Sequence, residues 1–364
     1  MGIPKSSAPT IIDVAERAGV SRATASRAMS NYGRISAETA LKVRAAAEEL
    51  GYRPNQVARA MRAGRTKTLG LVILADFTSA FFDRATKAIV DAARARDYQV
   101  LIANTDTGLD AEKHALEVLL EKKVDGLIVV TSATAPSEHL SRSHLGGVPL
   151  VLVDRTIEGF EVSSVTTDDY AGGVEAVRHA YSLGHTNFGF VVAALGIEGF
   201  SEKRPEVLIS SVRQRVEGFI RGCEELGIRK AQQTWLFCEN TPKVAEAAMR
   251  KLLSPKKRPS ILIVSNNDMA IAALKFAANQ KLVVGRDLSL ITFDDSPWAE
   301  AMFPGITVVA RPVEILGERA VTKVLELLEK PDQPAIQTVL PTELISRGSV
   351  ANLVMYPELK PEGN

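Results

Sequence analysis

Charged and amide side chains directly follow short apolar runs at four places in the sequence. Carboxylate and amide oxygens accept hydrogen bonds from hydroxyl groups in defined directions, so these residue types suit the recognition of a sugar. Each group alone is equally typical of a turn or a helix cap. Because the ends of parallel strands meet at one edge of a sheet, however, we interpret the four groups together as the polar lining of one ligand cleft. They are Asp76, Asp154-Arg155, Asn266-Asn267-Asp268 and Asp294-Asp295.

The sequence shows no arrangement typical of catalysis or metal binding. Its five histidines are scattered, and none lies in a nucleophile or metal motif. Cys223 and Cys238 are the two cysteines, and neither has the neighbouring His or Cys of a zinc site. We therefore expect a protein that is not an enzyme and that holds no metal or cofactor. Since neither a long apolar run nor a secretion signal is present, we also expect reduced thiols and a cytoplasmic location.

A second set of functional side chains is the basic cluster near the N-terminus. Residues 1–67 carry twelve Lys or Arg and five Asp or Glu, whereas the remainder carries 32 basic and 38 acidic residues. A basic head on an acidic body is typical of a segment that meets phosphates. Charge alone leaves open a chance cluster on a solvated face.

Three helices are expected to position these basic residues. Thr10 and Asp13 mark the start of the first, because a threonine cap and a carboxylate three residues later satisfy the free N–H groups of a helix end. Gly19 ends it, since glycine enters the left-handed backbone region cheaply. Capping serines predict a second helix over residues 21–29 and a third over residues 36–50.

Two short helices joined by a tight glycine turn form the helix-turn-helix motif, whose second helix enters the major groove of DNA. Each residue of that helix turns about 100° from the last, so four residues share one arc while Ala25, Ala28 and Met29 face the first helix. Arginine is shaped to read guanine, and serine can hold a phosphate. The arc consists of Arg22, Ala23, Ser26 and Arg27.

The head is similar to that of the lactose-repressor and galactose-repressor family of bacterial transcription regulators. The resemblance is carried by Asp13-Val14-Ala15, Ala18-Gly19-Val20-Ser21, Thr24, Ser26-Arg27 and Gly51-Tyr52-Arg53-Pro54-Asn55, and it continues to about residue 348. It implies a homodimer that binds a pseudo-palindromic DNA operator and is controlled by a small-molecule effector. It assigns operator choice to Arg22 and Ala23. It also assigns a base contact to Arg27 and a place in a DNA-touching loop to Arg34.

A short hinge is expected between head and body, over residues 53–67. Pro54 forces the residue before it out of helix, and Asn55 can cap a helix of about two turns. A helix this short is marginal in water, so the segment either folds on DNA beside a partner subunit or stays a disordered linker. The resemblance implies that Met61, where the family usually has leucine, enters the DNA as an apolar wedge. It also implies DNA contacts at Ser21, Asn55 and Ala58, and a contact between paired hinge helices at Val57.

From residue 68 onward, short apolar runs alternate with amphipathic stretches, which predicts parallel sheets with helices on both faces. The expected fold class is therefore an all-α helix-turn-helix head followed by a doubly wound α/β body. The resemblance implies the two-lobed fold of periplasmic sugar-binding proteins, with crossovers near residues 166, 294 and 330. The expected units are the head over 1–52, the hinge, a body over 68–348 with lobe one at 68–166 and 295–329 and lobe two at 167–294 and 330–348, and a flexible tail over 349–364.

The same resemblance makes several strand-end residues expected effector contacts. Two departures from the family leave the effector open between a sugar, a sugar phosphate and a purine. The segment 196–210 is several residues longer than in the lactose repressor, and Arg311 stands where several relatives carry glutamine. The resemblance implies contacts at Asp154, Arg215, Asn267 and Asp294 and an apolar lining at Phe81, with Phe82 either beside Phe81 or in the core. Asp76 is added because it is polar and follows the first strand.

Two functions compete with that of an effector-controlled regulator, which we expect to be a repressor. A sugar-binding transport protein would share the body, but the basic head and the missing secretion signal argue against it. An enzyme would need a nucleophile or metal motif, and the histidines and cysteines form neither. The sequence leaves open whether the effector releases or promotes DNA binding, and which operator is read.

Overall fold

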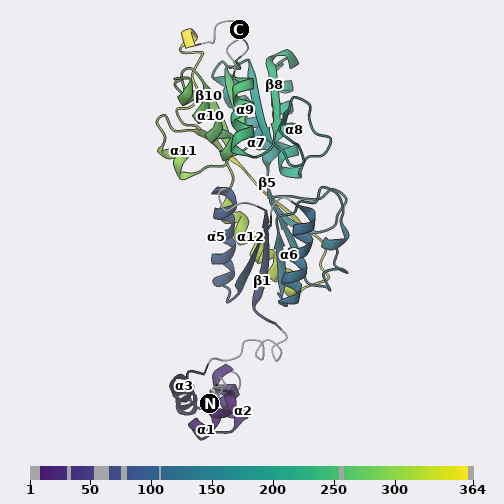
Figure 1. Cartoon of the computed structure of the whole chain (residues 1–364), viewed down its shortest axis with the longest axis vertical. Helices are drawn as coiled ribbons and strands as arrows, with labels where there is room; N and C mark the ends of the chain where they lie inside the picture. The colour runs from purple at the N-terminus through teal and green to yellow at the C-terminus, as the bar shows by residue number, and fades with distance from the viewer. Residues whose placement is uncertain are drawn as a thin grey trace, which may run out of the picture. The chain divides into compact units, whose positions relative to one another are not determined.

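The structure is a computed structural model that describes residues 9–30, 34–52, 65–74, 80–105, 108–253 and 258–359. It divides into two compact units, residues 1–67 and 68–364, and each is described by itself (Figure 1). The first unit is a helical head and the second is a doubly wound α/β body, which confirms the expected fold class. Within the described residues, none of the helices combines the length and the hydropathy needed to cross a membrane.

Three helices form the head around one small apolar core. The first starts with the predicted capping box, in which the backbone N–H of Thr10 donates to Asp13 Oδ2 at 2.6 Å. It ends at Gly19, whose φ of 65° lies in the left-handed region. The hydroxyls of Ser21 and Ser36 each accept a hydrogen bond from the N–H three residues later. The helices are α1 (Ile11–Ala18), α2 (Arg22–Ser30) and α3 (Ala37–Glu49), and their core contains Val14, Ala15, Ala25, Ala28, Val43, Ala46 and Ala47.

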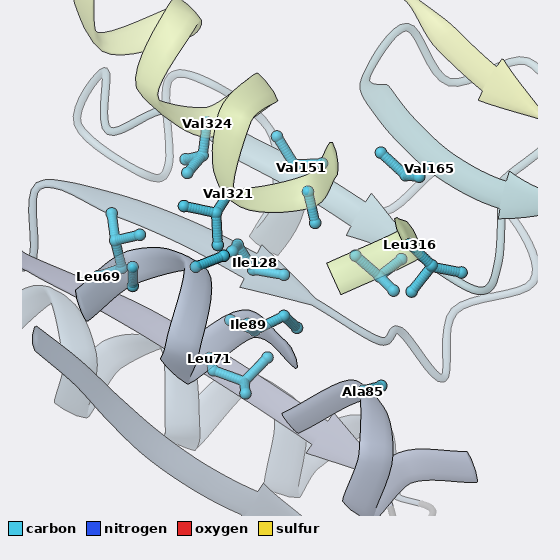
Figure 2. Close-up of a cluster of buried hydrophobic side chains, with 14 of the residues drawn as sticks. Leu69, Leu71, Ala85, Ile89, Ile128, Val151, Val165, Leu316, Val321 and Val324 are labelled. Atoms are coloured by element: carbon cyan, nitrogen blue, oxygen red, sulfur yellow. The ribbon is translucent and has the colours of Figure 1, made fainter. Parts of the chain in front are cut away.

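Lobe one of the body is built on a six-stranded parallel sheet of order β12-β5-β4-β3-β1-β2. Alternate strand residues point to opposite faces. Leu71 and Ile128 therefore pack under two helices on one face, as Figure 2 shows, while Val72 and Leu127 pack under a third helix on the other. The elements are β1 (Thr68–Leu74), α5 (Ala80–Arg94), β2 (Gln99–Thr105), α6 (Leu109–Glu121), β3 (Gly126–Val129), β4 (Leu150–Val153), β5 (Ser163–Thr167), α12 (Val313–Glu329) and β12 (Gln337–Leu340).

Lobe two is built on a seven-stranded sheet of order β13-β11-β10-β9-β6-β8-β7, parallel except for its two edge strands. Val191 and Leu262 pack under α9 and α10, and Phe190 and Ile263 pack under α7 and α8 on the opposite face. The elements are α7 (Asp169–Ser182), β6 (Phe188–Ala193), β7 (Phe200–Ser201), α8 (Ser210–Glu225), β8 (Gln233–Cys238), α9 (Pro242–Leu252), β9 (Ile261–Val264), α10 (Asn267–Asn279), β10 (Ser289–Phe293), α11 (Pro297–Ala301), β11 (Thr307–Ala310) and β13 (Glu343–Ile345).

The chain crosses between the lobes after β5, after β11 and after β12. The first crossing lies next to residue 166. The sequence places the second near residue 294, which is wrong, because β11 pairs in parallel with β10 and keeps residues 295–310 in lobe two. It places the third near residue 330, which is also wrong, because β12 pairs with β5 in lobe one. Neither strand is an unbroken run of large apolar residues like the equally short β4 and β9: β11 reads TVVA, and β12 reads QTVL and is partly exposed.

The segment after β13 packs onto lobe two, which corrects the flexible tail expected over residues 349–364. Ala351 is buried, and its N–H donates to Ser289 Oγ at 2.9 Å. Its carbonyl accepts a hydrogen bond from His185 Nε2 at 3.0 Å. Burial lowers the pKa of His185 to about 4, so the ring is neutral at pH 7. Leu353 is buried as well, and the chain is therefore fixed at least this far.

Helices α7 and α8 approach each other closely through glycines. A Cβ added to Gly218 would lie 2.1 Å from the carbonyl oxygen of Tyr170, and one added to Gly173 would lie 2.8 Å from the carbonyl oxygen of Arg215. Backbone atoms in packed helices cannot move aside as the end of a flexible side chain can, so both positions require glycine. This contact fixes the helix that carries Arg215.

Replacing Gly218 by alanine is expected to destabilise the protein by about 1–3 kcal/mol, the usual cost of an overpacked contact. Urea unfolding followed by circular dichroism measures the change. Gly108→Ala is the matched control, because its added Cβ would meet no atom within 4 Å and its φ of −105° suits alanine. Equal losses of stability in the two variants would contradict the packing argument.

Candidate functional site

Helix α2 has a buried side and an accessible side. Ala25 and Ala28 are buried in the core of the head. The predicted DNA contacts in the described part of the head remain accessible: Ser26 is half-buried, and Ser21, Arg22, Ala23, Arg27 and Arg34 are exposed. The helix therefore carries Arg22 and Arg27 on its accessible side, opposite the buried alanines.

Several predicted site residues fall outside the described part of the chain. They are Asn55, Val57, Ala58 and Met61 of the expected hinge, and Asp76 of the expected cleft. Their roles stay predictions.

Asp154 and Asp294 occupy equivalent positions in the two lobes. Asp154 follows β4 and Asp294 follows β10. The backbone N–H of each donates to the next strand, to Val165 at 3.1 Å and to Val309 at 3.0 Å. Both aspartates have left-handed φ angles, 68° and 71°, which this residue tolerates better than most. Both are only 5% exposed, so each lobe places one buried carboxylate at the end of a strand.

The guanidinium of Arg311 binds both of these carboxylates. Its Nε donates to Asp294 Oδ1 at 2.6 Å, and its Nη1 donates to Asp154 Oδ1. Its Cζ lies 3.5 Å from the centroid of the Phe81 ring, within the range of a cation–π contact. Arg311 follows β11 directly, at the second crossover, and is buried. One side chain thus joins Asp154 and Phe81 of lobe one to Asp294 of lobe two.

Arg311, Asp154 and Asp294 form a charged cluster with Phe81, and its charges stabilise one another's ionised forms. Burial opposes the charge on Asp154, but Arg311 and two further arginines hold the pKa of the carboxyl below its usual value. Burial also opposes the charge on Arg311, yet the two aspartates raise the pKa of its guanidinium above the ordinary value. The ion pairs therefore persist at neutral pH.

Arg215, on α8, is bound by a third carboxylate, that of Asp169. Its Nε donates to Asp169 Oδ1 at 2.6 Å, and its Nη1 donates to the carbonyl of Ser265. Thr167 Oγ1 donates to the other oxygen of Asp169 at 2.7 Å and so orients this carboxylate. The guanidinium carbon lies 4.7 Å from the centroid of the Phe293 ring. Arg215 is therefore held by groups from several elements of the body at once.

Arg155 and Asn267 are among the residues near strand ends whose buried polar atoms lack a hydrogen-bond partner within the described part of the chain. Arg155 donates from Nη1 to the carbonyl of Thr131 at 2.8 Å, but its Nε, 3.5 Å from Asp154 Oδ2, makes no hydrogen bond. Asn267, the first residue of α10, is buried and has an unpartnered Oδ1. Buried polar groups are normally paired, so these atoms suit hydrogen bonds to a ligand.

Direct contacts also join the lobes near the cluster. The backbone N–H of Thr156 donates to Ser210 Oγ at 2.8 Å, and Arg213 Nη1 donates to Glu158 Oε2 at 2.8 Å. Ser210 begins α8 and ends the segment 196–210, whose strand β7 pairs with β8 at the edge of the sheet. The long segment noted in the sequence therefore ends at a contact between the lobes.

The cluster contains several of the residues that the sequence singles out. It also contains Arg311, which the sequence marks only as a departure, and Asp169, which stands at a helix start where a carboxylate is usually a cap. Phe82 packs against the core of lobe one. The predicted effector contacts that the structure brings together are Phe81, Asp154, Arg215 and Asp294.

Two protein-family models match separate parts of the chain. The model of bacterial regulatory proteins of the lacI family matches residues 10–55. The model of the periplasmic binding protein-like domain matches residues 177–350. The first match covers the head and the second lies within the body.

Relatives match nearly the whole chain. Catabolite control protein A of Priestia megaterium is 30% identical over 321 residues, which cover 88% of this chain and 93% of that protein. The transcriptional regulator GalS of Salmonella typhimurium is 32% identical over 346 residues, which cover 94% and 96%. The fold matches the crystal structure of the Lac repressor dimer bound to operator and the anti-inducer ONPF, with a TM-score of 0.81 at 23% identity, over 95% of this chain and all of that one. The resemblance inferred from the head is thus confirmed, and the chain belongs to the lacI family of bacterial regulatory proteins.

Proposed function

We propose that this chain is a transcriptional repressor that binds a pseudo-palindromic operator as a homodimer, with an operator affinity set by a small polar molecule bound between the two lobes. The observation that carries this proposal is the convergence of Asp154 and Asp294, one from each lobe, on one buried cluster. A ligand that contacts both carboxylates binds one arrangement of the lobes better than another. That difference in affinity is what allows a ligand to shift an equilibrium.

The groups around the cleft suit a hydroxyl-bearing effector. The carboxylates accept hydrogen bonds from hydroxyls, and the unpartnered Oδ1 of Asn267 does the same. Arg215 donates, and Phe81 offers an aromatic face against which a ring can pack. Asp76 completes the proposed set, although it lies outside the described residues.

The head reads the operator in this proposal. Arg22 and Arg27 on the exposed side of α2 face the major groove, and Arg34 contacts the backbone. The hinge transmits the arrangement of the lobes, with Asn55 and Ala58 on DNA, Val57 against the partner's hinge, and Met61 between base pairs.

The coupling between effector and operator is expected to amount to about 1–3 kcal/mol, a typical value for allosteric proteins. The relatives are named as regulators and a control protein, not as enzymes, and we propose that this chain likewise acts without catalysis, in the cytoplasm where bacterial DNA lies. A screen of sugars, sugar phosphates and purines by thermal shift on the full chain identifies the effector. Operator binding with and without that ligand then tests the proposal, and an unchanged operator affinity would refute it.

Arg27→Ala is expected to weaken binding to the operator by about 1–3 kcal/mol, the usual value of a base-reading arginine. Binding to random DNA should change far less, since many cations contribute to it. Lys42→Ala is the control, because it removes one positive charge from an exposed side chain of α3. Fluorescence anisotropy on both DNAs measures the effect. An equal loss on operator and random DNA would reduce Arg27 to a phosphate contact.

Asp294→Asn is expected to abolish the thermal shift that the effector produces. A ligand at 100 times its dissociation constant stabilises the protein by about 2.7 kcal/mol, so the loss is easily measured. Asp295→Asn is the matched control, because the neighbouring carboxylate pairs with Arg347 at 2.9 Å instead of with Arg311. Unchanged ligand affinity in the Asp294 variant would remove this residue from the effector site.

A further inference from the structure

The guanidinium of Arg311 already occupies the place where the carboxylates of the two lobes meet. It donates one hydrogen bond to Asp154 and one to Asp294, and it lies on the face of the Phe81 ring. A neutral sugar in this place would make the same contacts, with hydroxyls donating to the carboxylates and its apolar face on the ring. Arg311 and a neutral sugar therefore compete for the same groups.

A neutral sugar is at a disadvantage in that competition. To reach Asp154 and Asp294 it must displace Arg311, which is buried, with its side chain only 4% exposed. The displaced guanidinium would lose both carboxylates to which it donates hydrogen bonds, and a buried charge that loses its partners is strongly unfavourable. Hydroxyl groups do not replace a lost counter-charge. A ligand that carries an anionic group does, because the group can pair with the displaced arginine in the two-point geometry that guanidinium favours.

The rest of the cluster agrees with an anionic ligand that also bears hydroxyls. The buried Nε of Arg155 has no hydrogen-bond partner among the described residues and can donate to an anion. Arg155 interacts electrostatically with both Asp154 and Arg215, so it belongs to the same cluster. Outside the cluster itself, the unpartnered Oδ1 of Asn267 lies two residues after Ser265, whose carbonyl Arg215 binds; this oxygen requires a donor, and a hydroxyl supplies one.

From this geometry we propose that Arg311 is the specificity-determining residue of the effector site, and that it selects a polyhydroxylated anion, bearing a carboxylate or a phosphate, over its neutral counterpart. The proposal rests on the function proposed above and names the chemical class of the effector. Arg311 stays bound to the two carboxylates unless the ligand brings an anionic group that pairs with the displaced guanidinium.

Isothermal titration calorimetry on the full chain with matched probes tests this. The probes are glucose against glucose 6-phosphate and gluconate, ribose against ribose 5-phosphate, and galactose against galacturonate. The wild-type protein is expected to bind the anionic member of at least one pair more than about tenfold tighter than the neutral member, a difference of about 1.4 kcal/mol. Arg311→Gln should remove that preference, because glutamine brings no charge and leaves both carboxylates to the sugar.

Two further variants separate specificity from folding. Arg347→Gln makes the same chemical change at a guanidinium that pairs with Asp295 outside the cluster, and it should keep the wild-type preference. Arg311→Lys keeps the positive charge and should keep a reduced preference for the anion. If Arg311→Gln does not fold, as judged by circular dichroism, the wild-type preference and its retention in the Lys variant decide the question.

Three results would overturn the proposal: tighter wild-type binding of the neutral member of each bound pair, an equal change for both members in Arg311→Gln, or no binding of any probe by the wild type and the Gln variant. Operator affinity measured with the same probes keeps the two proposals distinguishable. A neutral probe that binds the wild type and changes operator affinity upholds the proposed function and refutes the role of Arg311. An anionic probe that binds through Arg311 without changing operator affinity upholds the role of Arg311 and refutes the proposed function.

Discussion

The pairing of one buried guanidinium with two carboxylates is the interaction on which this body depends. A charge removed from water must be paired, and Arg311 is paired twice, once with each lobe. The arrangement of the lobes and the ionisation of the cluster therefore depend on each other. Separating the lobes exposes or unpairs charges, and changing the charges alters the preferred arrangement. A ligand that enters this cluster cannot avoid acting on the lobes.

The backbone prepares the cluster in the same way in both lobes. Asp154 and Asp294 each end a buried strand in the left-handed region, with the N–H bonded to the adjacent strand. Such backbone conformations are uncommon outside glycine and tend to occur at functional sites, where the surrounding structure holds them in place. The close glycine contact between α7 and α8 serves the same purpose for Arg215, because it fixes the helix from which that side chain reaches Asp169. The rigid elements therefore define the positions of the charges before any ligand binds.

The sequence predicts the parts of this protein that depend on local chemistry. The caps at Thr10 and Ser36, the turn at Gly19 and the strand-helix alternation all follow from neighbouring residues, and the structure confirms them. The errors arise where tertiary pairing decides. The four-residue strands β11 and β12 are recognisable only from the sheets they join, and residues 349–353 become buried only through contacts with lobe two. The ion pairs of Arg311 link positions 157 and 17 residues apart, which no local pattern reveals. Asp169 likewise resembles an ordinary helix cap until Arg215 is placed beside it.

The central claim is that the arrangement of the two lobes sets operator affinity, and a crosslink between them tests it most directly. The backbone N–H of Thr156 lies 2.8 Å from Ser210 Oγ across the two lobes, so these positions are the natural pair for a Thr156→Cys/Ser210→Cys crosslink, and titration of free thiols checks that it forms on oxidation. The native thiols should not interfere, since burial raises the pKa of Cys223 and Cys238 to about 12. The measurement is the operator affinity of the oxidised and the reduced variant, with and without an effector. We predict that the effector changes the affinity of the reduced protein, has no effect on the oxidised protein, and acts again after reduction. An equal response in the locked and unlocked proteins would contradict the account.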